Sequence, residues 1–394
     1  MLLFGCRTAW CGLFDFLLWL LLMRTVFLTS NTSWYLYNFR RSTILALRAQ
    51  GCRVVCLSPL DDFSQRLVSE LGAQHIALPL DGKSTGAVAE LRSLGFIWQT
   101  LRRYKPDFVF NFTVKMNIYG GLTCALQKIP FANNISGLGT AFIHDSWLFR
   151  RVRQVYGLAN RRARRLFFQN EEDLSVFRDA GLLGATPFTL LPGSGVNLQR
   201  FQASPLPQDG PLTFIMIARL LGDKGVREYG QACGLLVSQG LNLRCWLVGP
   251  LGVSNRTAIT EEEVSAWTAK GWVEYLGETD DVRPLIEQAH VLVLPSYWEG
   301  MPRTVLEAAA MGRPAIVTDV PGCRQAIEPG VTGWLCEARS ADSLAGQMKW
   351  VYELAPSERQ RAGDAARRRM EDMFSEERVV KAYLDCLLED RGQI

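Results

Sequence analysis

Two glutamates eight positions apart are the strongest candidates for chemistry in this sequence. Glu299 and Glu307 belong to the stretch SYWEGMPRTVLEAAAMG, residues 296–312. An apolar run ends just before it, and Pro302 suits the first turn of a helix because it has no N–H to leave unpaired. The free N–H groups of such a turn, with the helix dipole, attract an anion such as phosphate. The stretch therefore predicts a phosphate site at a helix start, flanked by two carboxylates.

The two carboxylates suit hydroxyl groups, because a carboxylate accepts hydrogen bonds from two neighbouring hydroxyls. Glu307 lies in the second helical turn, where it could bind a ribose, and Glu299 lies nearer the mouth of the site. Two diol-binding groups beside an anion site describe a nucleotide-diphosphate sugar. The alternative is an acidic first turn on an ordinary helix, which the helix dipole also favours.

The stretch ARLLGDKG at 218–225 follows another apolar run and places two cations around a glycine turn. Arg219 and Lys224 could both reach a diphosphate and neutralise the charge that grows as it leaves. The alternative is a solvated pair of charges without a ligand. The agreement between this stretch and the two glutamates favours the diphosphate.

Other chemistries fit less well. A two-carboxylate hydrolase needs its carboxyl groups on opposite sides of one bond, whereas Glu299 and Glu307 lie along one element. A nicotinamide enzyme would have G-x-G-x-x-G after the first strand, and TSNTSWYLYNF there contains no glycine. The ETDD stretch at 278–281 is no Asp-x-Asp motif, and the three histidines are isolated. We therefore expect no metal and no cofactor.

Short apolar runs alternate with amphipathic stretches along the chain, which predicts buried parallel strands joined by crossover helices. We expect strands at 25–29, 53–58, 107–112, 130–136, 212–218, 244–249, 273–278, 291–296, 314–319 and 333–337. We expect helices at 38–50, 62–71, 86–104, 116–127, 226–239, 340–354, 357–373 and 375–388, the last three with a serine near the start as a cap.

This alternation predicts an α/β fold with two doubly wound Rossmann-like domains facing a cleft, since 394 residues are too many for one core. Ligands bind such sheets at the carboxyl ends of the strands. Residues 23–202 form the expected N-terminal, acceptor-side domain, and 203–210, ASPLPQDG, form a linker. Residues 211–394 form the expected nucleotide-sugar-binding domain with the closing helices.

Residues 1–22 are either an upstream mis-start or a hydrophobic N-terminal segment. The run LFDFLLWLLLM at 13–23 is about half the length of a spanning helix and contains Asp15. A signal peptide is a third reading, but no small-x-small cleavage site follows. The ten cysteines are scattered and contain no C-x-x-C, which favours free thiols.

The motifs resemble family 4 nucleotide-sugar glycosyltransferases of the two-Rossmann-domain (GT-B) type. The resemblance rests on EG-P---LEA--MG-P from Glu299, on ARLLGDKG, and more loosely on LLPGSGVNLQRF (190–201) and FFQNEEDL (167–174). It implies that Arg219 and Lys224 hold the diphosphate, Glu307 the ribose, and Glu299 the transferred sugar. We expect the donor site to be completed by Gly300, Met301, Arg303 and Thr304.

The resemblance further implies a retaining transferase whose donor is a nucleotide-diphosphate sugar, which we expect to be UDP-linked. It is closest to transferases that act on polyprenyl-diphosphate-linked sugars, in lipopolysaccharide or capsule assembly, so we expect a polyprenyl-diphosphate-linked or glycan acceptor. Gln325 departs from the family pattern, in which an acidic residue is common after DVPG. A sugar-nucleotide epimerase of the same architecture and an inactive membrane-associated binder remain as alternatives.

The acceptor side is expected in three loops of the first domain that follow strands: SNTSWYLYNFRR, FTVKMNIYGG and ISGLGTAF. The two glycines of the last loop would allow close approach of a ligand, or they are plain turn glycines. The candidate acceptor residues are Tyr37, Asn38, Arg40, Lys115, Gly137 and Gly139.

Charge divides the chain: residues 1–205 carry 23 Lys and Arg against 12 Asp and Glu, and the remainder carries 20 against 27. The stretch Trp147–Arg165 has seven arginines, no acid and an apolar face, which is typical of a helix on a membrane surface. The alternative is a solvated basic face over an ordinary core helix. We expect a cytoplasmic protein, peripheral on the inner face of the membrane and binding no nucleic acid, with contacts from Arg150, Arg151, Arg153, Arg161, Arg162, Arg164 and Arg165.

Overall fold

The structure is a computed structural model that describes residues 23–80, 87–137, 147–253 and 255–390. Its chain forms two compact units. The first comprises the residues up to Phe168, Ser175–Thr189 and the chain from Val380 onward. The second comprises Gln169–Leu174 and Leu190–Val379. Each unit is built on its own parallel sheet, as the alternation of apolar runs predicts.

The first unit contains a seven-stranded sheet in the order β3-β2-β1-β4-β5-β6-β7. Neighbouring strands from β3 to β6 pair in parallel register. The order reverses between β1 and β4, which makes this the switch point of the sheet. The strands are β1 (Thr25–Thr29), β2 (Arg53–Ser58), β3 (Gln74–Ala77), β4 (Phe108–Phe112), β5 (Phe131–Ile135), β6 (Arg165–Phe168) and β7 (Phe188–Leu190).

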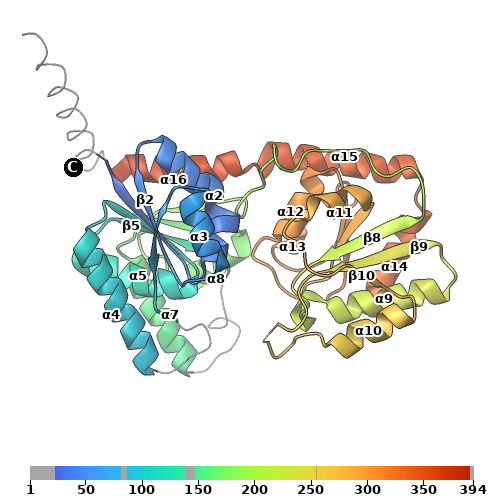
Figure 1. The fold of residues 1–394 in the computed structure, drawn as a ribbon, viewed down its shortest axis with the longest axis horizontal. Coiled ribbons are helices and arrows are strands. Elements are labelled where there is room, and N and C mark those ends of the chain that lie inside the picture. Colours follow the sequence, from blue (N-terminus) through green and yellow to red (C-terminus); the bar gives the residue numbers. More distant parts are fainter. Residues whose placement is uncertain (1–22, 81–86, 138–146, 254, 391–394) are drawn as a thin grey trace, which may run out of the picture. The chain divides into compact units, whose positions relative to one another are not determined.

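Helices cover both faces of this sheet. The neighbours α4, α5 and α7 lie on one face, and α2 and α3 pack together on the other (Figure 1). The helices are α2 (Ser33–Ala49), α3 (Asp62–Ser69), α4 (Ala87–Tyr104), α5 (Val114–Gln127), α7 (Trp147–Asn160), α8 (Glu171–Asp179) and α16 (Glu376–Glu389). The last two each run from the second unit into the first.

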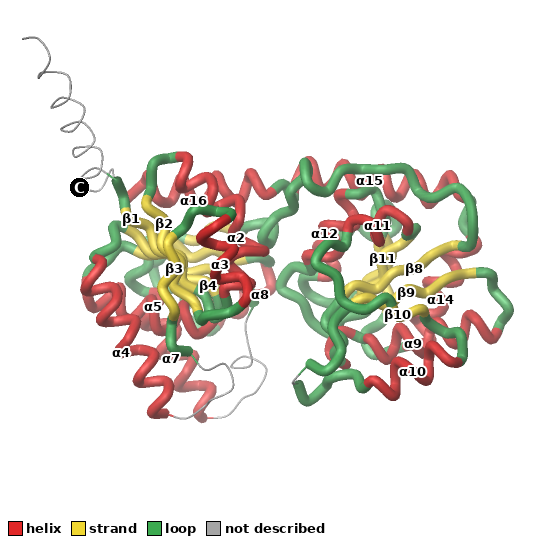
Figure 2. The backbone as a smooth tube through the Cα atoms, viewed as in Figure 1, coloured by secondary structure: helices red, strands yellow, loops and turns green. Residues whose placement is uncertain are grey.

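The second unit contains a six-stranded sheet in the order β10-β9-β8-β11-β12-β13, parallel throughout. Its strands β8, β9, β10 and β11 are labelled in Figure 2. Its switch point lies between β8 and β11. The strands are β8 (Leu212–Ile217), β9 (Leu243–Val248), β10 (Glu274–Tyr275), β11 (Val291–Leu294), β12 (Ala315–Thr318) and β13 (Gly333–Cys336).

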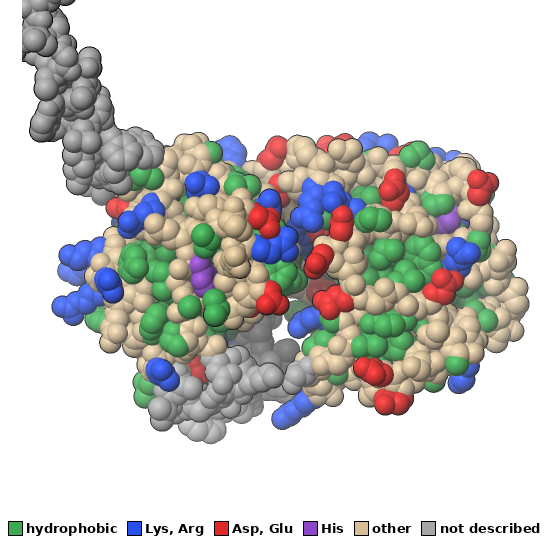
Figure 3. Space-filling view, viewed as in Figure 1, with side chains coloured by type: hydrophobic (Ala, Val, Ile, Leu, Met, Phe, Trp, Pro, Cys, Tyr) green, Lys and Arg blue, Asp and Glu red, His purple; other side chains and the backbone are tan. Residues whose placement is uncertain are grey.

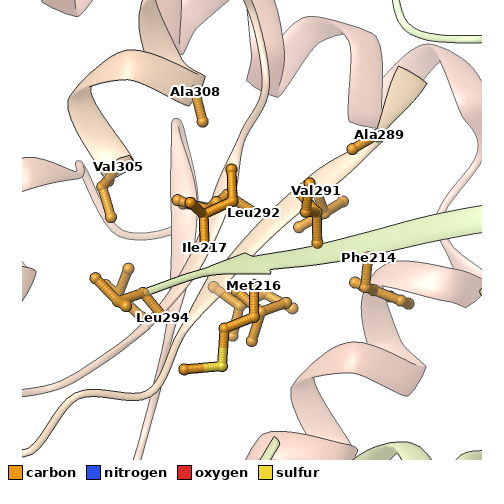
Figure 4. Close-up of a cluster of buried hydrophobic side chains, with 14 of the residues drawn as sticks. Phe214, Met216, Ile217, Ala289, Val291, Leu292, Leu294, Val305 and Ala308 are labelled. Carbon is orange, nitrogen blue, oxygen red and sulfur yellow. The ribbon is translucent and has the colours of Figure 1, made fainter. Parts of the chain in front are cut away.

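Two helical layers enclose the second sheet, with α9 and α14 in contact in one and α12 and α15 in the other. The helices are α9 (Val226–Ser238), α10 (Glu261–Ala269), α11 (Arg283–Gln288), α12 (Arg303–Ala310), α13 (Cys323–Ala326), α14 (Ala341–Glu353) and α15 (Pro356–Met373), with a 3₁₀ turn η1 (Gly222–Lys224) after β8. Val305 and Ala308 of α12 point onto the buried side chains of β8 and β11 (Figure 4). This packing fixes the helix that carries Glu307.

All ten predicted strands are present, although β10 is only two residues long. The strands β3 and β7 were not predicted, whereas β6 followed by α8 matches the strand-to-helix element that the family resemblance implies at FFQNEEDL, residues 167–174. Ser340 caps α14 and Ser375 caps Glu377 N–H in α16, as expected, but Ser357 is inside α15, which begins at Pro356. The eight described cysteines are free and buried. Residues 1–22 lie outside the described residues, and no helix within the described ranges has the length and apolar character to cross a membrane.

The units divide the chain differently from the predicted boundaries at 202 and 211. The end of the last helix belongs to the first unit because Tyr383 is fully buried there, against Phe110, Phe112 and Phe167. Asn134 Nδ2 donates to the Tyr383 hydroxyl at 2.6 Å. Residues from Val380 onward therefore complete the first core instead of closing the second.

The expected linker is held on the second unit by arginines. Arg313 is fully buried, and its guanidinium donates to six backbone carbonyls, including those of Ser204 and Pro205. Arg367 donates to the Phe201 carbonyl at 2.8 Å. Burial lowers the pKa of Arg313 to about 10, which still leaves it charged at neutral pH. The segment expected to be a linker is therefore an ordered part of the second unit.

Candidate active site

The two motifs with candidate chemistry leave neighbouring strands of the second sheet. The residues after β8 carry Arg219 and Lys224, and the residues after β11 carry Glu299. Because β8 and β11 are adjacent and parallel, both loops leave the carboxyl edge at the switch point, the usual place for a ligand in an open α/β sheet. The topology thus brings together residues about 75 positions apart in the chain.

Lys224 and Glu299 form an ion pair across this switch point. Their side chains are only 20% and 15% exposed. Ser296 Oγ donates to the same carboxylate oxygen, Glu299 Oε1, at 2.8 Å. The structure therefore joins two of the three predicted catalytic residues and adds Ser296, which sequence reasoning did not single out although it begins the motif.

The third predicted catalytic residue, Arg219, is exposed at the end of β8. Its carbonyl accepts from Leu221 N–H at 2.7 Å, and no hydrogen bond or ion pair of the Arg219 guanidinium is found among the described residues. The loop that carries it is held by the residues before α10: Gly222 N–H donates to Thr257 O at 2.6 Å, and Ile259 N–H donates to Leu220 O at 2.9 Å. The loop backbone is thus fixed while the guanidinium remains available.

The helix α12 begins at Arg303, with Pro302 as its N-cap residue and with neither a side-chain cap nor an acid in its first turn. No intramolecular acceptor is found for the N–H groups of Gly300, Met301 and Thr304 within the described chain. Unpaired N–H groups at a helix start form an anion site. Gly300, Met301 and Thr304 therefore lie where the sequence places a phosphate.

Glu307 lies one turn into α12 and is 9% exposed. Arg303 Nε donates to Glu307 Oε1 at 2.7 Å, so this second carboxylate also has a cationic partner. The predicted role of Arg303 in donor binding and that of Glu307 in ribose binding both remain predictions, and the two side chains are held together.

Glycines pack directly against the loop that carries Glu299. Gly322 has φ +78°, and a Cβ there would lie 2.3 Å from Glu299 O and 2.6 Å from Gly300 O. A Cβ on Gly193, with φ +64°, would lie 2.5 Å from Met301 Cγ. These contacts hold residues 299–301 close to two backbones, and a larger residue at either glycine would displace the loop.

Tyr297 braces the two loops. Its N–H donates to Asp223 O at 2.9 Å, and its hydroxyl donates to Glu228 at 2.6 Å. Arg339 lies over its ring, 4.7 Å from the centroid. Burial, together with Glu228, raises the pKa of Tyr297 to about 12, so the hydroxyl remains a donor at neutral pH.

Gln325, which departs from the family pattern, donates its amide to the Glu172 carboxylate. Arg324 lies 3.8 Å from the other oxygen of Glu172. An acidic residue at position 325 would be repelled by the like charge of Glu172, whereas the neutral amide of Gln325 can donate a hydrogen bond to it.

Two family models match this chain: "Glycosyl transferases group 1" over residues 199–369 and "Glycosyl transferase 4-like" over residues 25–170. The first match covers all six strands of the second sheet and both donor motifs, and the second match covers β1 to β6 of the first sheet. The chain belongs to the glycosyltransferase families that these two models describe.

Relatives of the glycosyltransferase include the Campylobacter jejuni N,N'-diacetylbacillosaminyl-diphospho-undecaprenol alpha-1,3-N-acetylgalactosaminyltransferase, 28% identical over 84% of this chain and 90% of that protein. A second is an Escherichia coli UDP-Gal:alpha-D-GlcNAc-diphosphoundecaprenol alpha-1,3-galactosyltransferase, 24% identical over 69% of this chain and 73% of that protein.

Among solved structures, sucrose-phosphate synthase from Thermosynechococcus elongatus matches with a TM-score of 0.77 and 17% identity, over 94% of this chain and 100% of that one. Anabaena Alr3699/HepE in complex with UDP matches with a TM-score of 0.75 and 17% identity, over 93% and 100%. These likenesses show that the fold is the GT-B architecture.

The acceptor-side candidates of the glycosyltransferase lie in helices more than in loops. The prediction that α2 begins near residue 38 was wrong, because Thr32 caps a helix that begins at Ser33. Tyr37, Asn38 and Arg40 are thus helical, and Lys115 lies in the first turn of α5, paired with Glu90 at 2.8 Å. Gly137 follows β5 with φ +147°, and Gly139 lies outside the described residues.

Two of these candidates are buried. Arg40 is fully buried, 4.6 Å from the centroid of the Phe112 ring, and donates to the Tyr35 hydroxyl at 2.9 Å. Tyr37 is 5% exposed, and its hydroxyl donates to the Glu70 carboxylate. Both side chains make contacts within the first unit that hold α2 in place. Their contact with an acceptor remains a prediction.

The basic stretch is only partly helical. The helix α7 ends at Asn160, and the following arginines continue into β6. Arg164 pairs with Asp390 at 3.0 Å and Arg165 pairs with Glu389, so these two have acidic partners that the local sequence does not show. Arg151, Arg161 and Arg162 are exposed. The predicted basic face therefore contains fewer than the seven arginines of the stretch, because Arg164 and Arg165 pair with acidic residues.

Proposed function

We propose that this glycosyltransferase moves a sugar from a UDP-linked donor to a polyprenyl-diphosphate-linked sugar, with retention of anomeric configuration, during assembly of a bacterial surface polysaccharide. The observation that carries the proposal is the meeting of Lys224, Glu299 and the open start of α12 at one switch point. The relatives above act, by their names, on diphospho-undecaprenol-linked sugars, and HepE was solved with UDP. These names support the substrate class.

In this proposal the donor diphosphate lies at the start of α12, where the N–H groups of Gly300, Met301 and Thr304 donate hydrogen bonds to its oxygens. Arg219 and Lys224 neutralise the negative charge that grows on the leaving oxygen. Glu299 accepts hydrogen bonds from the transferred sugar, and Glu307 from the ribose. The bond from the anomeric carbon to the phosphate oxygen breaks, a bond to the acceptor oxygen forms, and the acceptor proton passes to the leaving phosphate.

The test uses purified full-length protein, a panel of UDP-sugars and a short polyprenyl-diphosphate-linked sugar. We expect one pair to give a lipid product heavier by one sugar, with UDP released and with the donor's anomeric configuration in its NMR spectrum. Glu299→Gln should lose the product, whereas the exposed matched control Glu328→Gln should not. Release of a free sugar without a lipid product, or formation of an epimerised nucleotide sugar, would refute the proposed transfer.

We further propose that no metal ion is needed, because Arg219 and Lys224 can serve the leaving group. Across residues 23–80, 87–137, 147–253 and 255–390, no three His, Cys, Asp or Glu side chains form a group that could hold a metal. Turnover should therefore survive EDTA. Loss of activity on chelation that manganese restores would assign the leaving-group charge to a metal instead.

The acceptor lipid makes an inner-membrane surface the expected location. Lys and Arg side chains gather over the edge of the first unit beside α4 (Figure 3), and Arg102 and Arg103 form its basic last turn. With Arg151, Arg161 and Arg162 of the α7 region they could contribute about 1 kcal/mol each near anionic lipid.

Binding of the protein to anionic vesicles at low salt should weaken when Arg151, Arg161 and Arg162 are replaced by Gln. Replacement of the exposed arginines Arg361 and Arg368 in the second unit is the matched control. Equal binding by wild type and the first variant would confine any membrane role to other residues.

A further inference from the structure

The residues before α8 contribute a buried side chain to the second unit, Asn170, to which neither the donor motifs nor the family resemblance assigns a role. Asn170 is 2% exposed, and its amide makes three hydrogen bonds. Its Oδ1 accepts from Asp173 N–H at 2.7 Å, which caps the first turn of α8. Its Nδ2 donates to Asp173 Oδ2 at 3.1 Å and to Gly300 O at 3.0 Å.

The contact with Gly300 reaches the loop between Glu299 and α12. The carbonyl of Gly300 and the N–H of Met301 belong to the same peptide group, which is planar and trans. A hydrogen bond that fixes the direction of the carbonyl therefore fixes the N–H in the opposite direction. The Met301 N–H has no acceptor among the described residues, and it immediately precedes the open start of α12.

The other neighbours of this peptide group restrict it without choosing its direction. Gly322 contacts the carbonyl oxygens of Glu299 and Gly300 only by close packing, and Gly193 contacts the Met301 side chain. No other donor to Gly300 O is found in the part of the chain that the structure describes. Asn170 is therefore the group that sets the orientation of this peptide by a directed hydrogen bond.

Asp173 holds the Asn170 amide in turn. It is fully buried, and both its backbone N–H and its carboxylate contact the Asn170 side chain. Because the amide oxygen is taken by Asp173 N–H, the amide nitrogen must face Gly300 O and Asp173 Oδ2. The contacts with Asp173 therefore hold the Asn170 amide in one orientation. Capping of α8 alone would require only the bond from Asp173 N–H to the amide oxygen.

We propose that Asn170 is a positioning residue for the diphosphate site: it orients the Gly300–Met301 peptide so that the Met301 N–H faces the β-phosphate of the donor. The inference rests on the proposed function, because it assigns a donor to the anion site at the start of α12. Asn170 itself touches no substrate in this scheme and acts through the backbone of the catalytic loop.

Two substitutions separate capping from positioning. Asn170→Ser keeps an oxygen that can cap α8, because serine is a good N-cap residue, but it is too short to reach Gly300 O. Asn170→Asp keeps the cap and places an oxygen against the Gly300 carbonyl and the Asp173 carboxylate. The matched control is Glu171→Gln, one residue further along and exposed.

The test measures the affinity of the full-length protein for UDP and for uridine by titration calorimetry. With Asn170→Ser we expect UDP to bind about tenfold more weakly, the scale of one lost hydrogen bond to a charged group, and uridine to bind unchanged. Transfer at saturating donor should also fall by about tenfold. Asn170→Asp should lose more UDP affinity than Asn170→Ser, and Glu171→Gln should resemble the wild type.

A purely structural role predicts a different pattern. If Asn170 only supports folding, thermal stability falls and affinities for UDP and uridine change together, which overturns the inference. Unchanged UDP affinity in Asn170→Ser also overturns it while leaving the proposed function intact. If the wild type binds UDP no more tightly than uridine, the protein has no diphosphate subsite for UDP, and the proposed donor fails together with the inference.

Discussion

Replacing Lys224 with Met should separate the structural and catalytic consequences of the ion pair with Glu299. The pair is four-fifths buried, with side-chain exposures of 20% and 15%. Removal of one partner from a fully buried pair costs about 3–5 kcal/mol, because the other charge remains without compensation. The residual solvent access and the Ser296 hydrogen bond to Glu299 reduce this, so we expect a loss of about 2 kcal/mol for Lys224→Met.

Glu299→Gln should cost less, and the double variant should recover stability. With both charges removed, no buried group is left unpaired, and the coupling between the two sites should be about 1–2 kcal/mol. For a unit of this size, about 2 kcal/mol corresponds to roughly 4–8 °C in Tm. Turnover should behave differently, falling by about 10²–10³ in each single variant and not recovering in the double variant.

The assay is differential scanning calorimetry of the full chain beside steady-state sugar transfer, with the exposed Lys349→Met as the control. Additive losses of stability from Lys224→Met and Glu299→Gln would show that the two side chains do not interact in solution. Turnover near wild type in Lys224→Met would remove this lysine from the leaving-group site, whatever its effect on stability.

Three further predictions test the support of the site. Gly322→Ala should abolish transfer, because its Cβ would lie 2.3 Å from Glu299 O, whereas Gly330→Ala, with the same φ of +78° and open space, should cost only backbone strain; equal activity of the two would refute the packing argument. Arg313→Met should destabilise the protein by about 3 kcal/mol or more in a thermal melt, since it strands several buried carbonyls, while the 71%-exposed Arg361→Met should not. Burial raises the pKa of Asp173 to about 6 from an ordinary value of 3.8, so its neutral form is favoured by folding and the stability it contributes is lost as the pH rises from about 4 through about 6. Asp173→Asn should remove that loss, and parallel stability–pH curves for the two proteins would contradict it.

The parallel sheets could be predicted because their strands are continuous apolar runs buried on both faces. The strands that were missed lack this signal: β3 (Gln74–Ala77) and β7 (Phe188–Leu190) contain exposed residues at the sheet edges. The start of α2 was missed because Thr32, Ser33 and Trp34 look like loop residues, although Thr32 caps the helix. Edge position and capping are tertiary and local hydrogen-bond effects that apolar periodicity does not report.

The donor-site residues could be predicted individually, but their partners could not. Glu299 and Glu307 follow from one motif, while the pairing of Lys224 with Glu299 depends on β8 and β11 being neighbours. The contact of Asn170 with Gly300 joins residues 130 positions apart. Sequence reasoning did not single out Asn170: the spacing N-x-x-D is a local signal for its cap on Asp173 N–H, whereas its contact with Gly300 depends on the fold.

The pairing pattern has a consequence for how a donor would enter. Each carboxylate expected to bind hydroxyls, Glu299 or Glu307, is paired with a cation close to the expected diphosphate, Lys224 or Arg303. These four charges cancel, so they give no net attraction for an anionic donor. Arg219 is exposed and has no ion-pair partner among the described residues, and in the proposed function it supplies the excess positive charge. Donor binding as proposed would draw the paired cations toward phosphate and release both carboxylates to the sugar and the ribose, which links occupation of the anion site to readiness of the hydroxyl-binding groups.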